Sequence, residues 1–239
     1  MLYHLFQYLD RSYDLPGAGM FQYISFRSAL AVILALLITI TFGQGIIRFM
    51  QRRQIGEEIR NLGLEGQLQK RGTPTMGGIM FILGAGVTVF ILGWSFMLEG
   101  VFWHLYVYLF ALIFGLIGFV DDYRKVRQHQ NEGLTAKQKF VLQLAAAILF
   151  LCLMRYEGLL SNHLYIPFLN VSVEINWIVY LVFAAFVIVG CVNAVNLTDG
   201  IDGLACSVTF VVMVFFAVTG YLWSAGGAGA LFPAAMAGG

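Results

Sequence analysis

Residues 101–125 read VFWHLYVYLFALIFGLIGFVDDYRK, in which twenty residues without Asp, Glu, Lys or Arg run directly into Asp121 and Asp122. About 20 apolar residues span the hydrocarbon core of a bilayer, so residues 101–120 predict a transmembrane helix. Adjacent carboxylates at its end are costly unless they are paired, hydrated or bound to a metal. Two interpretations follow: a site for a cation or a phosphate, or a charged helix end that stops the span at water.

The composition predicts an integral membrane protein. The 239 residues are 59% hydrophobic and 11% charged, with a mean hydropathy of +0.80, whereas a soluble domain carries roughly 25% charged residues. The net charge of +1 gives no indication of a nucleic-acid partner. We therefore expect an all-α, polytopic helix bundle that forms a single transmembrane domain over residues 1–239.

Six stretches are apolar enough to cross the membrane, the fourth being short but extended by flanking basic side chains. They are residues 25–47, 76–97, 101–120, 140–154, 175–196 and 204–223. Residues 1–20 could form an amphipathic helix at the interface. Residues 157–174 alternate apolar and polar side chains around Pro167, which suggests a small hairpin.

The distribution of lysine and arginine predicts the orientation of the chain. Eleven of the fourteen basic residues fall in the loops after the first and third spans, and only Arg11, Arg27 and Arg155 lie elsewhere. Basic loops stay in the cytoplasm, so the N-terminus is predicted to be outside. The loop between spans five and six then also faces the cytoplasm, which gathers the polar segments on one face.

Residues 193–204, NAVNLTDGIDGL, form the richest of these polar segments. Asn193 and Asn196 share a helical face, and two aspartates follow, each with a glycine after it, which lets the backbone approach a ligand closely. The alternative is a plain joint between helices with an Asp as cap. A cap needs one Asp, so the pattern favours a binding site for a nucleoside or a cation.

Residues 70–78, KRGTPTMGG, combine two cations and several glycines with the start of a helix, including Lys70 and Thr75. Such a start suits phosphate, although the order is not that of a Walker A motif. The alternative is an ordinary positive-inside anchor, and Lys125 and Lys137 are open to the same two interpretations. Carboxylates, cations and glycines on one face together match a divalent metal that holds a diphosphate. The membrane position implies one lipid substrate and one soluble substrate.

Three motifs carry a resemblance to a known family. KRGTPTMGGIM at residues 70–80, GFVDDYRKV at 118–126 and NAVNLTDGIDGLA at 193–205 resemble the signatures of the phospho-N-acetylmuramoyl-pentapeptide transferases. This MraY family belongs to the polyprenyl-phosphate N-acetylhexosamine-1-phosphate transferases, or glycosyltransferase family 4. The resemblance implies Mg²⁺-dependent transfer of phospho-MurNAc-pentapeptide from its UDP carrier to undecaprenyl phosphate, giving lipid I and UMP for peptidoglycan synthesis. It also implies a bacterial inner-membrane protein with a cytoplasmic active site, which forms a homodimer as family members do.

The resemblance and the motifs together give the candidate residues. The catalytic candidates are Asp121, Asp122, Asp199, Lys125 and Lys137, with Asp121 and Asp122 also as ligands of Mg²⁺. The candidates for substrate binding are Lys70, Thr75, Asn193, Asn196, Gly200, Ile201 and Asp202, of which the last three match the segment that holds uracil. Thr75 and Asn193 are included for their place in the motifs.

The chain departs from the family after Leu204. Members have more helices than the six predicted here, a third aspartate that is the principal Mg²⁺ ligand, and a histidine-rich loop. We therefore expect a C-terminally truncated member that is inactive or nearly so alone. Three alternatives stay open: a sibling enzyme that uses UDP-GlcNAc, a non-catalytic membrane fragment, and a small-solute transporter, although transporters place ionisable groups inside their spans.

Overall fold

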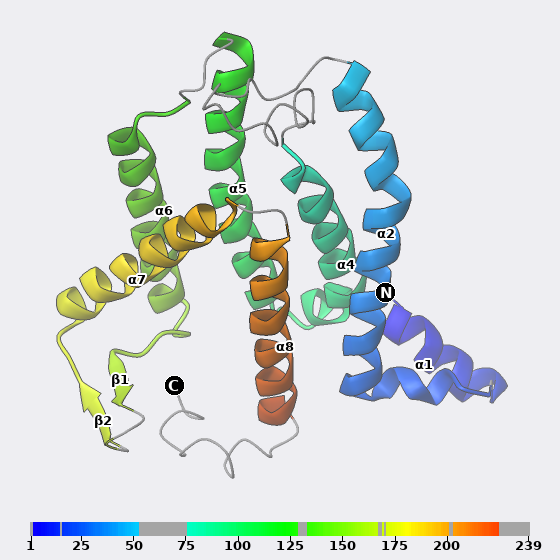
Figure 1. Ribbon diagram of the computed structural model, residues 1–239. Helices are drawn as coiled ribbons and strands as arrows, with labels where there is room; N and C mark the ends of the chain where they lie inside the picture. The colour runs from blue at the N-terminus through cyan, green and yellow to red at the C-terminus, as the bar shows by residue number, and fades with distance from the viewer. Residues whose placement is uncertain are drawn as a thin grey trace. The chain divides into compact units, whose positions relative to one another are not determined.

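The computed structural model describes residues 2–14, 16–52, 76–128, 133–166, 169, 171–200 and 203–224 (Figure 1). Its helices and strands are α1 (Leu2–Tyr13), η1 (Ala18–Gln22), α2 (Ile24–Arg52), α4 (Gly78–Leu98), α5 (Trp103–Gln128), α6 (Ala136–Tyr156), β1 (His163–Ile166), β2 (Val171–Glu174), α7 (Trp177–Thr198) and α8 (Leu204–Ser224). The chain divides into two compact units, Met1–Lys139 and Phe140–Gly239. The prediction of one domain over residues 1–239 stays a prediction.

The helical membrane fold is confirmed. Four helices, α2, α5, α6 and α7, are long and apolar enough to cross a bilayer, and α4 and α8 contain shorter apolar segments, Gly78–Trp94 and Leu204–Gly220. These six helices correspond to the six predicted spans. Large apolar side chains such as Val32, Phe186 and Phe210 are exposed along them, as expected for helices whose partner is lipid.

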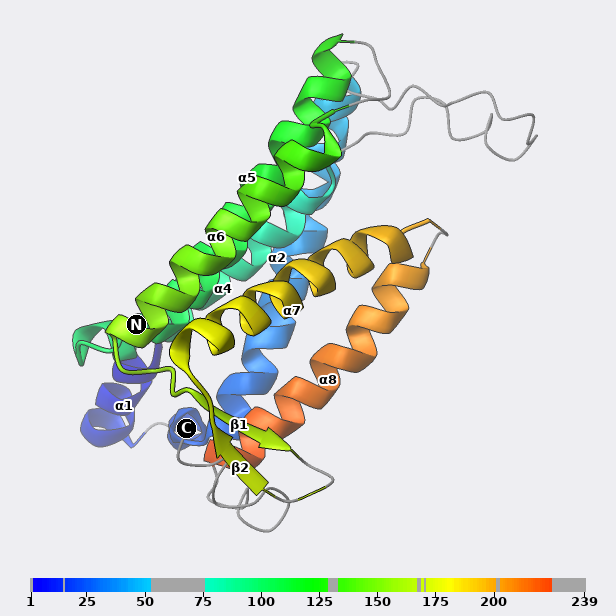
Figure 2. The same cartoon turned by 90° about the vertical axis from the view of Figure 1, so that its left-hand side faces the viewer.

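Unit 1 is built on three helices, α2, α4 and α5, that run side by side (Figures 1 and 2). α4 packs against both α2 and α5. On α4, a side chain at Gly86 would collide with the phenol of Tyr108 on α5, whose hydroxyl donates a 2.9 Å hydrogen bond to the Ile82 carbonyl. A small residue lets two membrane helices approach this closely.

The N-terminal helix α1 is present where an amphipathic segment was expected. Its Phe6 ring stacks on Phe21 of η1 with centroids 3.8 Å apart, and Phe21 in turn meets Phe26 of α2 edge-on. Tyr8 and Tyr13 are exposed, which suits aromatic side chains at a membrane–water interface.

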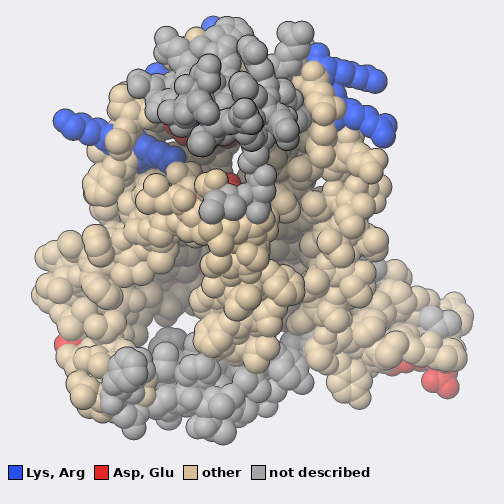
Figure 3. All heavy atoms as spheres, in the orientation of Figure 1, with Lys and Arg blue, Asp and Glu red and all other residues tan. Residues whose placement is uncertain are grey.

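Basic side chains gather at one end of unit 1. α2 ends and α5 ends there, and α4 and α6 begin there (Figures 1 and 2). Figure 3 shows Lys and Arg side chains at this end of unit 1. The described basic residues near these helix ends are Arg48, Arg52, Arg124, Lys125, Arg127, Lys137 and Lys139. The described helix ends that flank the two basic loops therefore lie together in unit 1.

Unit 2 contains the expected hairpin and the last two helices. β1 pairs with β2 antiparallel, with His163 opposite Glu174 and Ile166 opposite Val171. The Asn176 side chain caps α7 by accepting a 2.8 Å hydrogen bond from Ile178 N–H. The Arg155 guanidinium at the end of α6 lies 4.1 Å from the centre of the Trp177 ring on α7, a cation–π contact.

Candidate active site

The carboxylate pair lies inside α5 and not at its end. The apolar stretch stops at Val120, but the helix continues to Gln128, which is about two more turns. Residues three and four positions apart share a helical face, so Lys125 faces both aspartates. Its Nζ lies 3.0 Å from Asp121 Oδ2 and 3.1 Å from Asp122 Oδ1. The predicted transmembrane stretch thus ends at Val120, whereas the helix itself continues past the two carboxylates.

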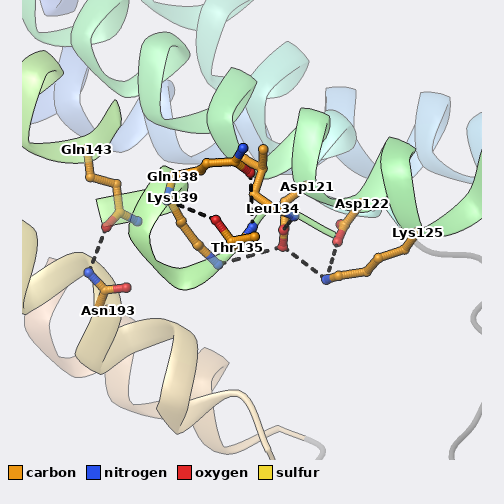
Figure 4. A network of polar contacts seen from close by, with 9 residues as sticks. All are labelled: Asp121, Asp122, Lys125, Leu134, Thr135, Gln138, Lys139, Gln143 and Asn193. Carbon is orange, nitrogen blue, oxygen red and sulfur yellow. Dashed lines mark hydrogen bonds and ion pairs between the residues drawn. The ribbon is translucent and has the colours of Figure 1, made fainter. Parts of the chain in front are cut away.

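Asp121 is the buried member of the pair, with 7% of its surface exposed. Its Oδ1 accepts a 2.7 Å hydrogen bond from Leu134 N–H, and its Oδ2 meets Lys125 at 3.0 Å and Lys139 at 3.7 Å. Figure 4 shows these donors around the carboxylate. A buried carboxylate is tolerated when it is paired and hydrogen-bonded in this way.

Asp122 is more accessible and makes fewer contacts. Its side chain is 37% exposed, against 10% for Asp121. Among the described residues, its recorded partner is Lys125, at Oδ1. The two neighbouring aspartates therefore differ: one is enclosed by donors, and the other has an oxygen that can face a ligand.

The start of α6 brings a lysine to the pair that the sequence did not single out. Lys139, counted only as a basic residue of the loop, reaches Asp121. Lys137, the candidate that the family resemblance implied, is exposed on the same turn, and no ion pair to it is found in the described part of the chain. The catalytic role of Lys137 stays a prediction.

A capping box fixes this start. Thr135 Oγ1 accepts from Gln138 N–H at 3.3 Å, and Gln138 Oε1 accepts from Thr135 N–H at 3.2 Å. The Thr-x-x-Gln spacing is a sequence signal for a helix start, and it could have located Lys139 on the first turns of α6. Arg124 on α5 also donates to Gln138 Oε1, at 3.4 Å.

Unit 2 carries the second polar segment, at the end of α7. Asn193 Nδ2 donates to Gln143 Oε1 of α6 at 2.7 Å (Figure 4). It also donates to the Val189 carbonyl at 2.8 Å. Gln143 is 3% exposed, and no local pattern in the sequence pointed to it. Asn196, Asp199 and Gly200 are exposed, with Asp199 at the C-cap of α7.

Four predicted residues, Lys70, Thr75, Ile201 and Asp202, lie outside the described residues. The described residues do bring Asp121, Asp122 and Lys125 together within unit 1. The other described candidates belong to unit 2, and they are Asn193, Asn196, Asp199 and Gly200.

The described residues contain no group of three His, Cys, Asp or Glu side chains that could hold a metal by themselves. Mg²⁺ is commonly held by one or two carboxylates together with waters and substrate phosphates. The carboxylate pair meets that requirement, because Asp122 offers an accessible oxygen beside Asp121.

Comparisons with known proteins show the family to which the chain belongs. The family model for glycosyl transferase family 4 matches residues 104–238, and phospho-N-acetylmuramoyl-pentapeptide-transferase signature 1 matches residues 70–82. A curated phospho-N-acetylmuramoyl-pentapeptide-transferase of Desulfotalea psychrophila is 42% identical over 227 residues, which cover 93% of this chain and 60% of that protein. The chain thus spans about 60% of the length of the relative that it matches. It belongs to glycosyl transferase family 4, and within that family it carries the MraY signature.

Proposed function

We propose that this protein transfers phospho-MurNAc-pentapeptide from UDP-MurNAc-pentapeptide to undecaprenyl phosphate and releases UMP and lipid I. The observation that carries the proposal is a carboxylate pair balanced by lysines at the edge of an apolar stretch. Such a pair lies where a lipid phosphate and a soluble diphosphate can meet. The similarity to a curated transferase of that name supports the choice of sugar.

The lysines account for how anionic substrates could approach a pair of carboxylates. Lys125 lies between Asp121 and Asp122, and Lys139 Nζ lies 3.7 Å from Asp121 Oδ2. These fixed positive groups offset the repulsion between the carboxylates and the anionic substrates. They also stabilise negative charge that develops on the phosphate oxygens. The accessible Asp122 carboxylate is placed to take a proton from the lipid phosphate, and the enclosed Asp121 holds Lys125 beside it.

Magnesium is the proposed cofactor. Asp121 and Asp122 would hold the ion, with Asp122 offering the more exposed oxygen. When bound, Mg²⁺ supplies charge neutralisation on the diphosphate. The two aspartates themselves hold Lys125 between them.

The uridine end of the substrate is assigned to unit 2. Asn196, Asp199 and Gly200 are exposed at the end of α7, where carboxylate and amide groups can bind a ribose or a uracil. Asn193 is bonded to Gln143 and Val189, so its amide orients the helix end. Lys70, Thr75, Ile201 and Asp202 are proposed to bind phosphate and uracil on the strength of their motifs.

The proposed location is the bacterial inner membrane, with the site on the cytoplasmic face. The gathering of lysine and arginine at the site's end of unit 1 supports this face (Figure 3). Membership of a transferase family also favours an enzyme over a small-solute transporter.

A substrate panel tests the proposal. The purified chain in detergent is given undecaprenyl phosphate, with UDP-MurNAc-pentapeptide or UDP-GlcNAc, and with Mg²⁺ or EDTA. Nucleotide-sugar binding and UMP release are measured separately, so that recognition of the substrate and its turnover can be told apart. We expect binding to prefer the muramoyl substrate, and any turnover to need Mg²⁺. Preference for UDP-GlcNAc, or binding of neither nucleotide, contradicts the proposal.

A further inference from the structure

The start of α6 holds both oxygens of Asp121. Leu134 N–H donates to Oδ1 at 2.7 Å, and Lys139 Nζ lies 3.7 Å from Oδ2. Leu134 precedes α6 and Lys139 lies on its first turns. The orientation of this carboxylate on α5 therefore depends on where α6 begins.

The capping box determines that starting point. Thr135 and Gln138 each accept a hydrogen bond from the backbone N–H of the other, at 3.3 and 3.2 Å. This reciprocal pair satisfies two N–H groups that a helix start leaves without partners. With Thr135 fixed as the cap, the N–H of the preceding Leu134 is free to turn toward Asp121 and not into the helix.

Gly133 leaves room for this contact. A Cβ placed on Gly133 would collide with Asp121, both with its carboxylate Oδ1 and with its backbone carbonyl oxygen. Residue 133 must be a glycine because its backbone comes this close to Asp121. The turn that delivers the Leu134 N–H thus passes so near Asp121 that a side chain at residue 133 would displace one of them.

We propose that Gly133, Thr135 and Gln138 are positioning residues that hold Asp121 in one orientation for phosphosugar transfer. The assignment to that reaction rests on the proposed function. These residues act through Leu134 N–H and touch Asp121 only through the backbone. Arg124, one turn after Asp121 on α5, donates to Gln138 Oε1 and so ties the cap to the helix that carries the pair.

Site-resolved hydrogen exchange of the Leu134 amide tests the proposal in the purified chain. Thr135→Val and Gln138→Leu remove one side of the box, and we expect exchange of this amide to rise about tenfold, the effect of one lost hydrogen bond. Thr135→Ser and Gln138→Glu keep the box and should keep the protection. Ala136→Ser, an exposed change on the same turn, is the matched control.

Two further variants show that Asp121 is the partner. Asp121→Ala should release the Leu134 amide as much as Thr135→Val does, whereas Asp121→Asn retains an oxygen acceptor and should protect it. Unchanged protection in Asp121→Ala, or in both Thr135→Val and Gln138→Leu, overturns the positioning role. Gly133→Ala should expose the same amide, and the box variants decide the matter if that variant does not fold.

Steady-state kinetics test whether the capping box affects the proposed reaction. In any turnover that the chain shows, we expect Thr135→Val to lower kcat about tenfold with KM for the nucleotide sugar unchanged, and Thr135→Ser to restore it. Loss of Leu134 protection with kcat retained would refute the link to catalysis. A wild-type chain that binds no nucleotide sugar contradicts the proposed function instead, and the exchange measurements then decide the positioning of Asp121 alone.

Discussion

Asn193 on α7 donates a 2.7 Å hydrogen bond to the Gln143 side chain on α6, and Gln143 is 3% exposed. The second N–H of the same amide donates to the Val189 carbonyl. Both residues lie in helices apolar enough to cross a bilayer, where a polar group without a partner is costly.

We therefore expect Gln143→Leu to lower the free energy of unfolding in detergent by about 1 kcal/mol, since hydrogen bonds between membrane helices contribute about that much. A double-mutant cycle with Asn193→Leu is the control. The double variant should lose less than the two single losses together, and strict additivity would show that the bond contributes nothing.

The two aspartates should differ in their contribution to stability. Asp121→Asn removes the charge that two lysines contact in a buried place, so we expect a loss of about 2 kcal/mol. Asp122→Asn removes one contact at a half-exposed place, and the expected loss is about 0.5 kcal/mol. Unfolding curves for the two variants measure both values, and an equal loss would contradict the asymmetry. Under the proposed function, both substitutions lower turnover.

Replacing Lys125 should lower stability and turnover more than replacing its basic neighbours does. Lys125→Met leaves two adjacent carboxylates without the cation between them, so we expect about 1–2 kcal/mol lower stability and, under the proposed function, about 100-fold lower kcat. Arg127→Met is the matched control, because Arg127 is exposed on the same turns of α5. Similar losses for Lys125→Met and Arg127→Met would mean that Lys125 acts only as part of the general positive charge.

Gly86 should be intolerant of a side chain. Gly86→Ala places a Cβ against the Tyr108 phenol, and such overpacking costs about 1–3 kcal/mol. Gly45→Ala on α2 is the control, since its Cβ would meet no atom within 4 Å, and it should be neutral or stabilising by up to about 1 kcal/mol. Combining Gly86→Ala with Tyr108→Val should recover part of the loss. If the double variant is no more stable than Gly86→Ala, the clash is not with Tyr108.

The sequence predicted the helices well because each depends on a local apolar run. The stretch ending at Val120 gave α5 its membrane segment, but hydropathy does not report that a helix continues once its surface turns polar. Asp121, Asp122 and Lys125 were found from their motif, and their helical spacing explains why they meet.

The remaining contacts join side chains that come from different helices. Lys137 and Lys139 look alike in the sequence, and only Lys139 reaches Asp121. Gln143 and Asn193 are 50 residues apart, so no local pattern links them. The capping box of Thr135 and Gln138 was readable, but its effect on Asp121 depends on a tertiary contact through Leu134.

The unbroken course of α5 from Trp103 to Gln128 has a further consequence. Its apolar part from Trp103 to Val120 has 18 residues, about 27 Å of helix, which is close to the thickness of the hydrocarbon core. The same rigid rod that spans the lipid carries the carboxylates, so the length of its apolar part fixes how high above the acyl chains they stand. Each residue inserted below Val120 would raise the pair by about 1.5 Å and rotate it by about 100°. The length of the apolar part of α5, matched to the thickness of the bilayer, therefore sets the height of the carboxylate pair relative to the lipid.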